Sequence, residues 1–196
     1  MIFAYRLAYS SFRLATIDSL LAPGFRFEFS PIDVDSFQIE PTWGRDEELR
    51  SIERMFSGEE GRWPTGEARP PLDTELSINP QLIPVADSEW IEGAEPGHFV
   101  RSYSTAMILY YIEGIDIVSG VQTFEVVDIS GTGGPDGQSA SGYAILNWHD
   151  GGILPPPLGF GEASPPTSPA RSQFEGVRAV HAASWGYVKA SFREPE

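Results

Sequence analysis

The fold of this chain is decided by its most hydrophobic stretch, FVRSYSTAMILYYI at residues 99–112. Alternation along it places one set of apolar side chains on a single face, namely Phe99, Tyr103, Met107, Leu109 and Tyr111. From Ile108 onward both faces are apolar. Alternation with a period of two is typical of a strand, and apolar side chains on both faces indicate a position inside a sheet. We therefore predict a central β-strand at residues 99–112.

Further strands are expected on both sides of this one. Residues 121–129 alternate again, and the short apolar run 115–119 lies between Gly114 and Gly120, which favours a hairpin or meander after the central strand. Alternating or apolar runs also predict strands at four other places: residues 2–9, 25–29, 143–148 and the end of 177–192.

One helix is predicted with clear boundaries, at about residues 45–57. Leu49, Ile52 and Met55 follow helical spacing, three acidic residues occupy the start, and Gly58 lies just beyond the end. Acidic residues stabilise a helix N-terminus and glycine commonly ends a helix. The spacing from residue 14 to residue 21 also fits a short helix better than a strand, although it is ambiguous.

Glycine and proline define the rest of the organisation. The chain of 196 residues contains 20 glycines and 17 prolines, which gather in the segments 58–97 and 151–172. Regular elements longer than about five residues are not expected there, because both residue types interrupt helices and strands. The predicted fold is a mainly β, antiparallel sandwich or barrel-like domain with one short helix. A single domain is predicted to span residues 1–196, with 58–97 and 151–172 as extended loops.

Charge and composition exclude several classes of function. A net charge of −15 without a basic cluster argues against binding to nucleic acid and to anionic membranes. The absence of cysteine excludes disulfides, thiolate catalysis and cysteine-ligated metals. The first residues have no signal-peptide pattern, so the expected location is a virion or the cytoplasm rather than a secreted one.

The sequence contains no complete catalytic pattern. The glycine-rich run at 131–137 has neither the spacing nor the lysine of a phosphate-binding loop and is interpreted as a loop tip. The most suggestive group is His149 with Asp150, which together with Asp33 and Asp35 could form a metal or general-base cluster if the fold joined them. A turn after the strand explains the same residues more simply. No catalytic residue, metal ligand or cofactor is therefore predicted, and the chain is expected not to be an enzyme.

Four residues are candidates for contacts with other proteins. Trp63 and Trp90 lie in a segment rich in proline and glycine, where burial of a tryptophan in the core is less strongly expected. Glu47 and Glu48 lie on the predicted helix. The leading hypothesis is a structural subunit of a large assembly, such as a capsid- or tail-associated component of a bacteriophage-type virion. Its loops and edge strands would bind neighbouring subunits, so the chain is expected to be oligomeric in context. The alternatives are an acidic inhibitor or immunity protein that blocks a basic toxin or nuclease, and a metal-dependent hydrolase built on His149 and Asp150.

Overall fold

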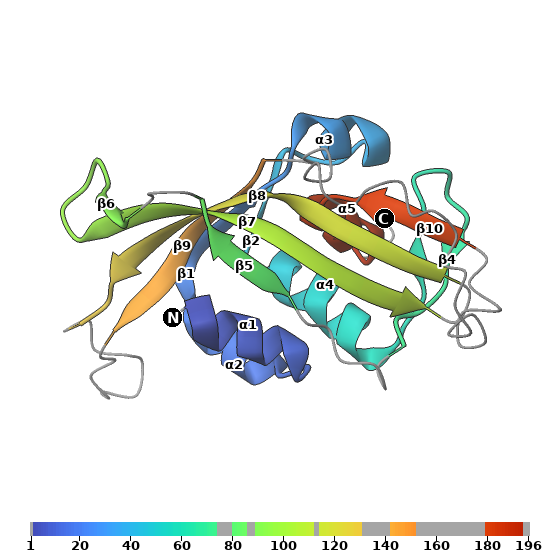
Figure 1. The fold of residues 1–196 in the computed structure, drawn as a ribbon, viewed down its shortest axis with the longest axis horizontal. Helices are drawn as coiled ribbons and strands as arrows, with labels where there is room; N and C mark the ends of the chain where they lie inside the picture. The colour runs from blue at the N-terminus through green and yellow to red at the C-terminus, as the bar shows by residue number, and fades with distance from the viewer. Residues whose placement is uncertain are drawn as a thin grey trace, which may run out of the picture.

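One eight-stranded sheet dominates the computed structural model, which describes residues 2–73, 80–85, 89–111, 114–130, 142–151 and 179–193. The strand order is β2-β1-β9-β8-β7-β5, with β10 paired to β8 and β6 paired to β7 (Figure 1). The strands of this sheet are β1 (Leu21–Glu28), β2 (Thr42–Gly44), β5 (Gln81–Pro84), β6 (Ile91–Glu92), β7 (His98–Tyr111), β8 (Gly114–Asp128), β9 (Tyr143–Asp150) and β10 (Ala179–Ala183). A separate small hairpin consists of β3 (Gly61–Arg62) and β4 (Ala68–Arg69).

The antiparallel hairpin of β7 and β8 is the backbone of the sheet. Its pairing runs from His98 opposite Val127 to Tyr111 opposite Gly114. The predicted central strand and the predicted hairpin are therefore confirmed. The strand does not stop at Gly120, since β8 continues through it as one element. Such long strands are stabilised by cross-strand contacts along their whole length.

The sheet is mixed rather than antiparallel. Strand β1 runs parallel to β9, and β10 runs parallel to β8 along the half of β8 that β9 leaves unpaired. The expectation of a mainly β chain is confirmed, but the expectation of an antiparallel sandwich or barrel is wrong. In the described part of the chain the sheet packs against helices instead of against a second sheet, and it does not close on itself.

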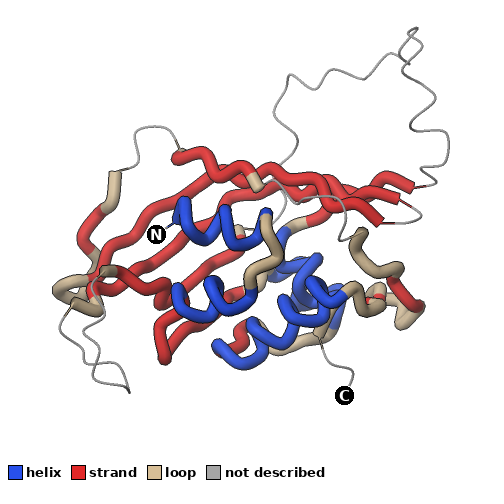
Figure 2. Tube along the Cα trace, turned by 90° about the horizontal axis from the view of Figure 1, so that it is seen from below, coloured by secondary structure: helices blue, strands red, loops and turns tan. Residues whose placement is uncertain are grey.

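Five helices are described where only one was predicted with clear boundaries. They are α1 (Ile2–Ser10), α2 (Leu14–Leu20), α3 (Pro31–Phe37), α4 (Arg45–Ser57) and α5 (Trp185–Ser191). Figure 2 shows them gathered on one side of the sheet. The predicted helix at 45–57 and the ambiguous one near residue 14 are confirmed, as is the strand at 25–29. No helix in the described ranges is long and apolar enough to cross a membrane.

Two predicted strands are corrected to helices. Residues 2–10 form α1, which buries Tyr5, Ala8 and Tyr9 at helical spacing, so the two-residue alternation there is coincidental. At the C-terminal end, β10 stops at Ala183 and α5 follows it, because the Ser184 side chain accepts a hydrogen bond from the backbone N–H of Tyr187 and caps the helix.

Of the two segments predicted to be long loops, only 58–97 lies largely within the described residues. Within 58–97, the described residues hold only β3, β4, β5 and β6, none longer than four residues, as predicted. Residues 152–172 and the glycine-rich run 131–137 lie outside the described residues. The space between helices and sheet is filled by aromatic rings, for example Trp148, whose centroid is 4.9 Å from Phe124 and 5.0 Å from Tyr5.

Candidate functional site

A buried ion pair lies between the helices and the sheet. Lys189 of α5 places its Nζ 2.5 Å from Oε1 of Glu48 in α4, and neither side chain is exposed to solvent. The same Nζ lies 3.4 Å from the ring centre of Trp148 and 3.9 Å from that of Phe27. Burial lowers the pKa of Lys189 to about 8, against the opposing effect of the Glu48 carboxylate. The only lysine in the chain is thus held as an enclosed cation over aromatic faces.

Several polar atoms surround this pair. The second carboxylate oxygen of Glu48 accepts a hydrogen bond from the indole N–H of Trp43 at 3.1 Å. The hydroxyls of Tyr5 and Tyr9 and the indole N–H of Trp185 are also buried beside it. Burial raises the pKa of both tyrosines well above the ordinary value, so both are neutral donors at physiological pH.

Two buried carboxylates meet next to α5. Asp33 accepts hydrogen bonds from the hydroxyls of Ser30 at 2.8 Å and Ser184 at 2.7 Å. Asp150 accepts from the side-chain amide of Gln122 at 2.8 Å and from the backbone N–H of Gly186. Burial raises the pKa of Asp33, the two serine hydroxyls lower it, and the charge of Asp150 raises it further.

Gly186 leaves room for these carboxylates. A Cβ at this position would lie 2.7 Å from an oxygen of Asp33 and 2.7 Å from an oxygen of Asp150. This separation is shorter than side-chain contacts allow, so the close approach requires glycine. The site is therefore an internal polar cluster that locks α3, β9 and α5 together.

The metal cluster considered from the sequence forms only in part. Asp33 and Asp150 do come together, but His149 lies on the opposite face of β9, where its Nδ1 is 3.1 Å from Glu28. Asp35 is exposed. No group of three or more possible metal ligands occurs in the described residues, and the complete cluster of His149 with Asp150, Asp33 and Asp35 considered from the sequence does not form.

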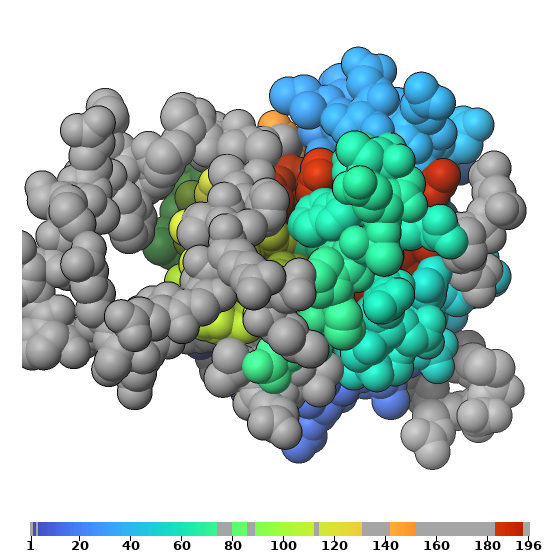
Figure 3. All heavy atoms as spheres, turned by 90° about the vertical axis from the view of Figure 1, so that its right-hand side faces the viewer, coloured from blue at the N-terminus to red at the C-terminus, as the bar shows by residue number. Residues whose placement is uncertain are grey.

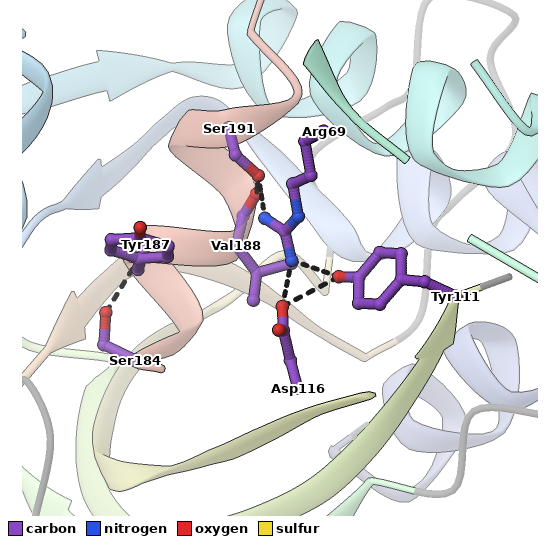
Figure 4. Close-up of polar contacts among 7 residues, drawn as sticks. All are labelled: Arg69, Tyr111, Asp116, Ser184, Tyr187, Val188 and Ser191. Atoms are coloured by element: carbon purple, nitrogen blue, oxygen red, sulfur yellow. Dashed lines mark hydrogen bonds and ion pairs between the residues drawn. The ribbon is translucent and has the colours of Figure 1, made fainter. Parts of the chain in front are cut away.

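A second buried ion pair anchors the β3–β4 hairpin (Figure 4). The guanidinium of Arg69 donates to Asp116 of β8, to the hydroxyl of Tyr111 of β7 and to Ser191 of α5. It also lies 4.8 Å from the ring centre of Trp63. In Figure 3 the hairpin, in turquoise to green, lies over α5, in red. The pair is fully enclosed, and it ties the hairpin to the sheet and to α5.

An apolar cavity of about 310 Å³ opens at the other end of the sheet. It lies between α1, the segment before β6 and the helix-covered face of β7, β8 and β9. Its lining consists of Ile2, Trp90, Phe99, Tyr103, Val126 and Tyr143. The Tyr103 ring is 5.8 Å from Phe124, whose ring is 4.9 Å from Trp148. A continuous column of aromatic rings therefore separates the cavity from the Lys189–Glu48 pair.

The four predicted interface residues occupy different environments. Trp90 lines the cavity, Trp63 packs over Arg69, and Glu47 accepts a hydrogen bond from the backbone N–H of Gly44 at the start of α4. Glu48 is buried and is not on the exposed face of the helix. Contacts of Trp63, Trp90 and Glu47 with a protein partner remain predictions.

Sequence reasoning did not find the buried charges Lys189, Arg69 and Asp116. One signal was available for Lys189, since it is the only lysine and it stands between Val188 and Ala190 in an apolar run. Arg69 and Asp116 lie in segments whose partners are distant in sequence, so no local pattern indicates their pairing.

Comparisons with known proteins give matches in structure only. No family model matches the sequence, and a comparison with curated proteins gives no match. The chain is similar to an NTF2-like superfamily protein from Salmonella enterica serovar Typhimurium, with 12% identity and a TM-score of 0.49, over 82% of this chain and 91% of that chain. An NTF2-like protein of unknown function in nutrient uptake from Rhodospirillum rubrum has 14% identity and a TM-score of 0.47, over 78% of this chain and 95% of that chain. A candidate scytalone dehydratase from Novosphingobium aromaticivorans has 13% identity and a TM-score of 0.48, over 76% of each chain.

These neighbours correct the functional prediction. They are described as NTF2-like proteins and as a candidate enzyme, not as virion components, so the prediction of a structural virion subunit is wrong. The alternative of an acidic inhibitor is not retained either, because Glu48, one of the two helix glutamates expected to contact a partner, is paired with Lys189 inside the protein.

Proposed function

We propose that this protein binds a small, predominantly apolar molecule in the cavity between α1 and the sheet. The observation that carries this proposal is the lining, which consists of four aromatic residues and two aliphatic ones around a volume of about 310 Å³. Ligand pockets of proteins have volumes from about 300 Å³ upward and are lined mainly by apolar and aromatic side chains with a few polar groups.

The chemistry of the lining supports binding without a chemical step. The polar atoms at the tips of the lining side chains are the hydroxyls of Tyr103 and Tyr143 and the indole N–H of Trp90, which orient a ligand by hydrogen bonding. Burial raises the pKa of Tyr103, so its hydroxyl is a neutral donor. The amine of Lys189 lies beyond the aromatic column and does not line the cavity.

The test uses the neutral fluorescent probe N-phenyl-1-naphthylamine, whose emission rises in apolar surroundings. Saturable binding to the wild-type protein is expected. Val126→Phe adds a ring to the cavity wall and should abolish binding. Its matched control is Val127→Phe, which adds the same volume one residue further on, where the side chain points to the opposite face of β8.

Two results would overturn the proposal. The first is the absence of saturable probe binding by folded wild-type protein. The second is equal binding by Val126→Phe and Val127→Phe, which would place the probe outside the cavity. Circular dichroism and thermal melting of both variants establish that loss of binding does not follow from loss of the fold.

A further inference from the structure

One arginine next to the cavity has no role in the fold described above. Arg101 lies on β7 between Phe99 and Tyr103, and residues two apart on a strand share a face, so its side chain leaves the strand on the face that lines the cavity. Across the hairpin its partner is Phe124 of β8. The guanidinium carbon lies 5.4 Å from the ring centre of Tyr103.

The neighbours of Arg101 on its own face of β7 and on the adjacent strands are aromatic. Phe99 and Tyr103 flank it along β7, and Phe124 faces it from β8. On the other side of β7, Ile91 of β6 pairs with Val100, which brings the preceding residue Trp90 alongside, with its ring 6.4 Å from that of Tyr103. Arg101 is therefore a positive charge beside an apolar cavity, flanked by two of the residues that line it.

Among the described residues, no carboxylate pairs with the half-buried Arg101, and its buried Nε makes no hydrogen bond. The chain has 28 acidic residues against 13 basic ones, and other arginines have a carboxylate partner, for example Arg69 with Asp116 and Arg54 with Glu59. An enclosed donor without an acceptor is rare in folded proteins and points to a ligand that supplies one.

We propose that Arg101 binds the carboxylate of the ligand, so that the cavity takes a small apolar monocarboxylic acid. The inference rests on the proposed function of the cavity and specifies the ligand's chemical class. The planar guanidinium presents paired N–H donors that match the two oxygens of a carboxylate. The proximity of Arg101 lowers the pKa of Tyr103 against the effect of burial, which is consistent with a guanidinium close to the tyrosine hydroxyl. The apolar body of the acid would pack against Trp90, Phe99 and Val126.

The test compares two molecules that differ in charge but hardly in shape, 2-naphthoate and 2-naphthamide. Each is titrated at neutral pH against wild-type protein loaded with N-phenyl-1-naphthylamine, and displacement of the probe is measured. The naphthoate should compete at a concentration at least about tenfold lower than the amide, which corresponds to about 1.4 kcal/mol. The net charge of −15 repels anions, so it cannot produce this preference.

Variants of Arg101 then identify the group responsible. Arg101→Met keeps the aliphatic stem and should remove the preference for the acid while leaving competition by the amide unchanged. Arg101→Lys keeps the charge and should retain part of the preference. Arg26→Met removes an exposed arginine from β1 and should leave both competitors unaffected. If Arg101→Met does not fold, Arg101→Gln replaces it, because glutamine can still donate hydrogen bonds beside the cavity.

The outcomes separate this inference from the proposed function. Equal competition by acid and amide in the wild type overturns the role of Arg101 and leaves the cavity as a neutral binding site. A preference for the acid that survives in Arg101→Met also overturns it, because another group would then hold the carboxylate. Failure of the neutral probe to bind folded wild-type protein overturns the proposed function itself.

Discussion

Replacing Lys189 by methionine tests the most enclosed charge in the protein. Methionine keeps a similar length and remains packed against Trp148 and Phe27, but it leaves the Glu48 carboxylate buried without its cation. Breaking a buried ion pair in this way typically costs about 3–5 kcal/mol. We therefore expect Lys189→Met to lower the free energy of unfolding by about this amount at pH 7, measured by urea denaturation with tryptophan fluorescence.

A double-mutant cycle separates the ion pair from packing. Glu48→Gln alone should also be destabilising, because it leaves the Lys189 ammonium without its counter-charge. The double variant Glu48→Gln/Lys189→Met has no buried charge at this position and should recover about 2 kcal/mol or more of the summed losses. Full additivity of the two single changes would show that the two groups do not interact in the folded protein.

The pH dependence of stability provides an independent signature. The pKa of Lys189 is about 8 in the folded protein against 10.5 for an ordinary lysine. Between these values the unfolded chain binds a proton that the folded protein has released, so the free energy of unfolding rises with pH. The rise from pH 8 to pH 10 amounts to about 2 kcal/mol for this single group. From about pH 9 upward the tyrosines oppose this rise, because unfolded tyrosine begins to lose its proton there. Burial raises the pKa of Tyr5, Tyr9, Tyr103, Tyr111 and Tyr187, so the folded protein keeps these protons. The comparison with Lys189→Met cancels this contribution.

The reasoning would be refuted by either of two results. If Lys189→Met lowers the free energy of unfolding by less than about 1 kcal/mol, the amine is not enclosed with Glu48. A stability difference between wild type and Lys189→Met that stays constant from pH 8 to pH 10 would show that Lys189 keeps an ordinary pKa.

Three further outcomes follow from the buried polar groups. Gly186→Ala should lose about 1–3 kcal/mol of stability in urea denaturation, because the added methyl meets two carboxylate oxygens, whereas Gly24→Ala, whose nearest neighbour would be 3.7 Å away, should change it little. Arg69→Met should lower the free energy of unfolding by about 3–5 kcal/mol, because Asp116 is then buried without its cation. Adding Asp116→Leu should restore part of that loss, and the absence of any recovery would argue against the ion pair. Burial raises the pKa of Asp33, so the folded protein keeps its proton after the unfolded chain has released it, and wild-type stability should fall as pH rises above about 4; a fall of the same size in Asp33→Asn would exclude this assignment.

The long strands and the well-capped helix could be predicted because their signals are local. The alternation of β7 and the acidic start of α4 depend only on residues within each element. The helix α1 could not be predicted in the same way, since Tyr5 and Tyr9 fit both periods and only the packing of α1 against Phe124 and Trp148 selects the helix. The parallel strands of the mixed sheet could not be predicted from the sequence either, because the pairing of β1 with β9 joins residues more than a hundred positions apart.

The candidate site shows the same division. An acidic, cysteine-free, mainly β chain with one lysine and a central hairpin follows from the amino-acid sequence alone, because composition is a count and alternation involves only neighbouring residues. Three features depend on the packing of distant segments: Lys189 faces Glu48, His149 and Asp150 point to opposite faces of the sheet, and Arg101 lies beside an apolar cavity. The physical reason is that burial and the choice of ionic partner depend on contacts between distant segments, which a hydrophobic pattern along the chain does not encode.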